Sequence, residues 1–167
     1  MQKILAKILN VKFDGILAIR SNLIMRKQIA PLLKEELEKD MKTILVDAVN
    51  TFIIKEVGIS DRMYKILEKY PNRKIILTGA NDKEMEKFGL NNIPYEVFTL
   101  KHNPEKTNPE YYKIMLKHFN LNSEDVIYFE HSQAAITSAQ TVGIITHYYD
   151  QDKKDLSALE KFINENL

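Results

Sequence analysis

Short apolar runs alternate with amphipathic stretches along the chain from residue 41 onward. Five runs that end near Gly, Pro, Asn, Asp or Glu predict strands at 43–48, 74–78, 95–100, 125–129 and 144–148. Between them, apolar residues recur at helical spacing, which predicts helices at 61–70, 82–88, 109–120, 132–142 and 156–164. Strands that alternate with helices favour a doubly wound parallel sheet with right-handed crossovers. We therefore expect residues 41–167 to form one Rossmann-like α/β domain of about five strands.

Residues 1–40 precede the first predicted strand and are expected to form a separate N-terminal extension. Asp14-Gly15 lies between two apolar runs, which is typical of a tight β-hairpin. The apolar residues within 4–9 and 16–23 also share helical faces, and we favour a mainly helical extension. Pro31 suits the first turn of a helix that runs to about Lys39. The extension either covers a site, in the same chain or across a homodimer, or packs against the sheet or the outer helices.

Composition narrows the function classes. Hydrophobic residues at 44% and charged residues at 28% are typical of a soluble globular protein, and a net charge of +1 gives no support for a nucleic-acid partner. The chain has no cysteine, which excludes disulfides, thiol catalysis and zinc–thiolate sites. No apolar run approaches the roughly 18 residues of a membrane span, and the N-terminus lacks a signal-peptide core. We expect a cytoplasmic protein with no membrane partner.

Chemically capable side chains follow the ends of the predicted strands. Asp47 ends the first strand, Thr78-Gly79 ends the second, Lys106 follows the third and Glu130 ends the fourth. Open α/β sheets bind ligands at this edge. Taken alone, Asp47 could cap the following turn or act as a nucleophile. Together, these residues suit phosphate chemistry, because a carboxylate can attack phosphorus, a second can help bind Mg²⁺, and hydroxyl, amide and ammonium groups can hold phosphoryl oxygens.

The four stretches resemble, in order, the four motifs of the haloacid dehalogenase-like (HAD) superfamily, most of whose members are Mg²⁺-dependent phosphatases. The resemblance covers about residues 41–150. The stretches are Asp47-Ala-Val-Asn-Thr51 for Asp-x-Asp-Gly-Thr, Ile75-Ile-Leu-Thr78-Gly79 for a strand that ends in Thr or Ser, Lys106-Thr-Asn-Pro109 for the lysine motif, and Glu130-His131-Ser132 for Asp-Asp-Ser.

The resemblance implies a role for each matched position. Asp47 would form an aspartyl-phosphate, and Asp47, Thr78 and Lys106 would be catalytic. The implied phosphate ligands are Thr78, Gly79 and Lys106. The implied Mg²⁺ ligands are Asp47, Glu130 and the backbone carbonyl of Val49. The other matched positions are Asn50, Thr51, His131 and Ser132.

Four positions depart from the family pattern. Val49 replaces the general acid/base aspartate, so a proton transfer worth roughly 10²–10⁴-fold is missing unless another group supplies it. Asn50 replaces a glycine, but asparagine tolerates left-handed backbone. Glu130 is one methylene longer than aspartate. His131 replaces an acidic residue and either acts as an acid/base or has no role.

These departures leave several functions open. The first is an active Mg²⁺-dependent phosphatase or phosphotransferase, and the second is a catalytically inactive HAD-fold protein used for binding or regulation. Dehalogenase and phosphonate-cleaving relatives also lack the second aspartate, which keeps a C–X bond hydrolase open. A receiver-like binding module is a further alternative, although receiver domains carry an acidic pocket on their first strand and only Asp47 is acidic at 43–48.

The spacing of the motifs leaves no room for an inserted cap domain. Only about nine residues separate Thr51 from Asp61, and the stretch 100–106 is equally short. In this family, members without a cap tend to act on large substrates or have the site covered by a partner, so we expect an open site for a phosphorylated substrate, small or macromolecular. His102, His118 and His147 fall on separate elements, which gives little support for a histidine metal cluster.

Overall fold

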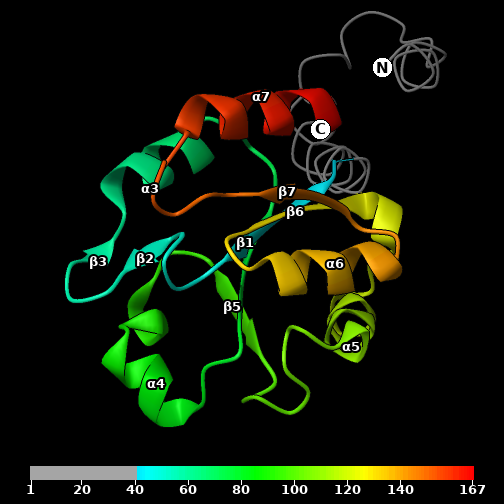
Figure 1. Ribbon diagram of the computed structural model, residues 1–167, viewed down its shortest axis with the longest axis horizontal. Coiled ribbons are helices and arrows are strands. Elements are labelled where there is room, and N and C mark those ends of the chain that lie inside the picture. The colour runs from blue at the N-terminus through cyan, green and yellow to red at the C-terminus, as the bar shows by residue number, and fades with distance from the viewer. Residues whose placement is uncertain (1–40) are drawn as a thin grey trace, which may run out of the picture. The chain divides into compact units, whose positions relative to one another are not determined.

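A computed structural model describes residues 41–167, and the expectations for residues 1–40 fall outside this range. The described chain contains a parallel five-stranded sheet in the order β5-β4-β1-β6-β7, which confirms the predicted Rossmann-like α/β fold (Figure 1). The strands are β1 (Thr43–Asp47), β4 (Lys74–Thr78), β5 (Glu96–Thr99), β6 (Val126–Glu130) and β7 (Ile145–Tyr148). Because β1 is central, the residues that follow it lie between the ends of β4 and β6.

Helices cover both faces of the sheet, as Figure 1 shows. They are α3 (Asp61–Leu67), α4 (Asp82–Lys87), α5 (Pro109–Phe119), α6 (Gln133–Thr141) and α7 (Leu156–Asn166). Successive side chains of a strand point to opposite faces. Accordingly, Ile44 and Val46 belong to the core under α3 and α7, whereas Leu45 belongs to the core under α5 and α6. Burial on both faces explains the continuous apolar run of β1.

The helix ends follow local signals in the sequence. Ser60 accepts a hydrogen bond from the Met63 amide and caps α3. Gly89 and Gly143 follow α4 and α6 with φ of +68° and +85°, the left-handed backbone that favours glycine at this position. The prediction that α3 ends at residue 70 was wrong, since the helix ends at Leu67. Tyr70 packs against the same core beyond the last helical turn, so the apolar pattern is longer than the helix.

The structure contains one β-hairpin that the sequence did not predict. Strands β2 (Ile53–Ile54) and β3 (Gly58–Ile59) pair antiparallel between β1 and α3. Two-residue strands are too short to show a hydrophobic period. The segment between β1 and α3 therefore holds a hairpin and no cap domain. Two 3₁₀ turns, η2 (Leu90–Asn92) and η3 (Ser123–Asp125), complete the described elements. No helix within residues 41–167 is long and apolar enough to cross a membrane.

Candidate active site

Two buried carboxylates lie at the carboxyl ends of neighbouring strands. Asp47 is the last residue of β1 and is 2% exposed, while Glu130 is the last residue of β6 and is fully buried. The parallel register pairs Val46 of β1 with Phe129 of β6, which brings the two acidic residues to the same edge. Buried carboxylates require charged or hydrogen-bonding partners, and the chain supplies both.

Lys106 is the first of these partners. Its Nζ donates to Asp47 Oδ1 and to Glu130 Oε2, the latter at 2.6 Å, from the loop between β5 and α5. Burial lowers the pKa of Lys106, but the charges of Asp47 and Glu130 more than offset this effect and leave the pKa raised. Lys106 is therefore an ammonium ion that bridges both carboxylates.

His131 bridges the same carboxylates through their other oxygens. Its Nδ1 lies 2.7 Å from Asp47 Oδ2 and 2.9 Å from Glu130 Oε1. Hydrogen bonds to Asp47 and Glu130 raise the pKa of His131 from 6.5 to about 9. His131 is thus an imidazolium ion at neutral pH, so two cations balance two carboxylates. The sequence analysis considered an acid/base or no role for His131 and did not foresee this bridge.

Glu130 is held by two further donors. The Tyr128 hydroxyl donates to Oε2 at 2.5 Å, and the Ser132 amide donates to Oε1 at 2.8 Å. Burial raises the pKa of Glu130, but the charge of Lys106 and the hydrogen bonds from His131, Lys106 and Tyr128 lower it below its usual range. The sequence analysis missed Tyr128, although it lies two residues before Glu130 on β6 and therefore shares its face. The Ser132 side chain caps α6.

The turn after β1 supplies the remaining contact of Asp47. Asn50 adopts φ of +70°, which confirms that asparagine accommodates the left-handed turn. This turn returns Thr51 to the strand end, where its Oγ1 donates to Asp47 Oδ2 at 2.6 Å. The carboxylate oxygens of Asp47 thus contact the side chains of Thr51, Lys106 and His131. Within the described residues they accept no hydrogen bond from a backbone N–H, so Asp47 does not cap the turn.

Asp47, Lys106 and His131 line a cleft of about 290 Å³, which Thr78 and Gly79 also line. The predicted site residues Thr51, Glu130 and Ser132 do not line it. Thr78 Oγ1 accepts from the Ala80 amide at 3.1 Å, which leaves the hydroxyl proton for an acceptor in the cleft. A Cβ at Gly79 would lie 3.2 Å from both His102 Nδ1 and Glu105 Oε2. Glycine at this position therefore lets the side chains of His102 and Glu105 approach the backbone closely. The predicted residues Asp47, Thr78, Gly79 and Lys106 therefore line one space, together with Val49, Asn50 and His131.

The rim of the cleft contains a second charged cluster, which the sequence analysis missed. His102 Nε2 lies 2.6 Å from Glu84 Oε2, and His102 Nδ1 lies 2.8 Å from Glu105 Oε1. The hydrogen bond with Glu84 raises the pKa of His102, and the Glu105 contacts add to this effect although burial opposes it. The cluster joins α4 to the loop that carries Lys106. Glu84 and His102 lie in separate elements, so no local pattern in the sequence predicts their contact.

The carboxylates at the ends of β1 and β6 suit a divalent cation, although Asp47 lines the cleft and Glu130 is buried behind it. Asp47 and Glu130 each offer a carboxylate oxygen, and a ring nitrogen of His131 lies within 4.8 Å of both, although the imidazolium form of His131 has no lone pair for a metal. Carboxylate and carbonyl oxygens are the ligands that Mg²⁺ prefers. Among the residues the structure describes, none donates a hydrogen bond to the Val49 carbonyl, which leaves this oxygen open to a cation. Lys106 and His131 already contact both carboxylates, so a divalent ion would have to share these oxygens with them.

Comparisons with known proteins support the fold. No family model matches the sequence, and neither does any curated protein. A HAD family enzyme from Bacteroides thetaiotaomicron, an aspartate-to-alanine mutant in complex with magnesium and inorganic phosphate, superposes with a TM-score of 0.60 at 13% identity over 71% of this chain and 98% of that chain. A HAD-superfamily hydrolase from Geobacter sulfurreducens superposes with a TM-score of 0.51 at 11% identity over 65% of this chain and 87% of that chain. The chain therefore has the fold of the HAD-like hydrolases.

Proposed function

We propose that the protein is a phosphate monoester hydrolase that transfers the phosphoryl group to Asp47. The observation that carries this proposal is the setting of Asp47, a buried carboxylate at a strand end that is fixed by Lys106 and Thr51 and faces the cleft. Each carboxylate oxygen can accept two hydrogen bonds, and Oδ1 accepts one among the described residues. Oδ1 therefore retains a lone pair with which to attack phosphorus.

The same cleft supplies donors for the phosphoryl oxygens. The free hydroxyl proton of Thr78, the backbone amide of Gly79 and the ammonium group of Lys106 suit a tetrahedral anion. Asp47, Glu130 and the Val49 carbonyl would hold Mg²⁺, which in the HAD family enzyme from Bacteroides thetaiotaomicron is bound with inorganic phosphate. When bound, the ion offsets the charge of the phosphoryl oxygens beside Asp47.

The site offers no aspartate to protonate the leaving group. Val49 lines the cleft where the resemblance would place that acid, and the Nδ1 proton of His131 is shared by two carboxylates. A leaving group that receives no proton from the site departs as an anion, which favours substrates whose alcohol or acid is itself acidic. The substrate class that fits is an aryl or acyl phosphate rather than a simple alkyl phosphate.

A second candidate is a protein that binds a phosphorylated ligand without turnover. One observation favours it: Lys106 and His131 already neutralise Asp47 and Glu130, so the site is charge-balanced among its own side chains. In that case the cleft recognises a phosphoryl group through Thr78 and Gly79, and Asp47 has only a structural role.

Release of phosphate from p-nitrophenyl phosphate, with and without Mg²⁺, separates the two candidates. Hydrolysis is expected to require both Mg²⁺ and the Asp47 carboxylate, so Asp47→Asn should abolish it. The exposed Asp61→Asn variant is the matched control and should retain full activity. If phosphate release is absent from the wild type, or is unchanged in Asp47→Asn, the hydrolase proposal is wrong. Saturable binding of phenylphosphonate by an inactive wild type would support the binding protein if Thr78→Val in the cleft weakens it.

A further inference from the structure

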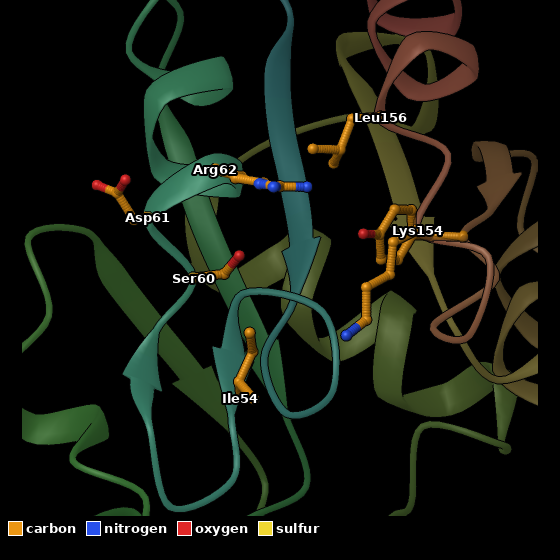
Figure 2. Close-up of a pocket in the computed structure, with 7 residues that line it drawn as sticks. Ile54, Ser60, Asp61, Arg62, Lys154 and Leu156 are labelled. Carbon is orange, nitrogen blue, oxygen red and sulfur yellow. The ribbon is translucent and has the colours of Figure 1, made fainter.

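A second pocket, of about 340 Å³, lies between β2, the start of α3 and the segment before α7 (Figure 2). It shares no lining residue with the cleft that contains Asp47. Ile54 of β2 lines this pocket, whereas the next residue, Lys55, lines the cleft. The two spaces are therefore separate, and consecutive residues at the end of β2 line one and then the other. The lining residues used below are Ile54, Ser60, Arg62, Tyr149, Lys154 and Leu156.

Two cationic side chains face this pocket. Arg62 and Lys154 come from α3 and from the segment before α7, and both extend into the space between these segments in Figure 2. Within residues 41–167, neither forms an ion pair. Asp61 also borders the pocket, but its carboxylate points away in Figure 2 and pairs with Lys65 at 2.7 Å. The charge that the pocket presents is thus positive.

Tyr149 provides an independent indication of a ligand. Its side chain lines the pocket and only 6% of the residue is exposed. Its hydroxyl makes no hydrogen bond with the residues that the structure describes. Among these residues, every fully buried polar side-chain atom has a hydrogen-bond partner. Among the described residues the hydroxyl is therefore not fully buried, and it belongs to a side chain that lines the pocket. Burial raises the pKa of Tyr149, so the group stays a neutral hydrogen-bond donor.

The remaining polar group is also a donor. Ser60 Oγ accepts from the Met63 amide at 3.4 Å, which leaves its proton for a ligand. Arginine and lysine can only donate, so the four polar side chains offer protons and no negative charge. Ile54 and Leu156 add apolar walls. We propose that this pocket binds the phosphoryl group of a small organic phosphate, with the apolar part of the ligand against these walls.

Nuclear magnetic resonance can test this site without reference to catalysis. The full chain, labelled with ¹⁵N, is titrated with phenylphosphonate, whose carbon–phosphorus bond withstands phosphate ester hydrolysis. Amide shifts are expected at Ser60, Arg62, Tyr149 and Lys154, as a set separate from any shifts around Asp47. Benzoate, with one charge and two oxygens, should bind this set of residues more weakly, and neutral benzyl alcohol should leave it unchanged.

Variants then assign the binding to the proposed donors. The double variant Arg62→Ala and Lys154→Ala should weaken binding at this set at least about tenfold, and Tyr149→Phe should weaken it about threefold. The matched control removes two exposed lysines outside the pocket, Lys153→Ala with Lys161→Ala, and should change binding less than about twofold. Shifts confined to the region of Asp47, an equal effect of the control variant, or equal shifts with benzyl alcohol would overturn the proposal.

Discussion

The Val49→Asp substitution tests how the proposed phosphatase manages without a proton donor. A positioned general acid contributes roughly 10²–10⁴-fold to a rate, which corresponds to about 2.7–5.4 kcal/mol of activation free energy. The new carboxyl would enter a cleft in which two cations already balance Asp47 and Glu130. Like charges nearby raise the pKa of a carboxyl, which favours the protonated form that an acid needs.

The expected gain depends on the leaving group. For alkyl phosphates, whose alkoxide needs a proton, Val49→Asp should raise kcat/KM by about 100-fold. For p-nitrophenyl phosphate, whose anion is stable, the change should be less than about threefold. The assay is a series of aryl and alkyl phosphates, with log(kcat/KM) plotted against the pKa of the leaving group. The plot should be steep for the wild type and shallower for Val49→Asp.

Val49→Asn is the matched control, since it is nearly isosteric with aspartate but is not an acid. It should keep the steep plot of the wild type. A shallow plot for the wild type would show that another group, such as His131, already donates the proton, and the reasoning about Val49 would be refuted. Equal gains from Val49→Asn and Val49→Asp would refute it as well, because those gains could not come from proton transfer.

Three further predictions concern the charge cluster. Lys106→Ala leaves His131 as the remaining cation for two buried carboxylates, so one buried negative charge is uncompensated and the free energy of unfolding in urea should fall by about 3–5 kcal/mol. The exposed Lys101→Ala should lower it by less than about 1 kcal/mol. A loss for Lys106→Ala no larger than that of the control would contradict the buried bridge. The pKa of His131 is raised from 6.5 to about 9, so its contribution to stability is complete below pH 6.5 and is lost as the pH rises to about 9. This contribution to stability is at most about 3 kcal/mol, and about 1–2 kcal/mol once solvent screening of the partly exposed ring is included. His131→Gln should remove this part of the pH dependence of stability. An identical pH profile of the variant would count against the role of His131. Tyr128→Phe removes one donor to Glu130 and should lower the free energy of unfolding by about 1–2 kcal/mol, and no measurable loss by urea denaturation would indicate that this hydroxyl contributes nothing.

The sequence was sufficient to predict the five strands of the parallel sheet and the five α-helices of the described domain, because their signals are local. Apolar runs mark the strands, and Ser60, Gly89 and Gly143 mark helix ends. The convergence of Asp47 and Glu130 could be predicted for a topological reason, since side chains at the ends of neighbouring parallel strands meet at one edge. The catalytic and metal-binding roles of these residues stay predictions until the experiments above are done.

Other features depend on contacts that no local pattern encodes. The β2–β3 hairpin consists of two-residue strands, too short to show a period. The link from Glu84 to His102 joins elements that only the folded chain brings together. The bridge formed by His131 could not be inferred from its position in the motif, because it depends on the direction of one ring nitrogen relative to two carboxylates.

Tyr111 has a consequence for how the cleft meets its ligand. Its hydroxyl donates to the carbonyls of Thr78 and Phe98, at 2.7 and 3.1 Å, and so ties together the ends of β4 and β5. Strand ends usually fray, but this tie keeps the backbone before Gly79 in place. A ligand that binds there meets a preorganised backbone, and little conformational entropy is lost when the complex forms.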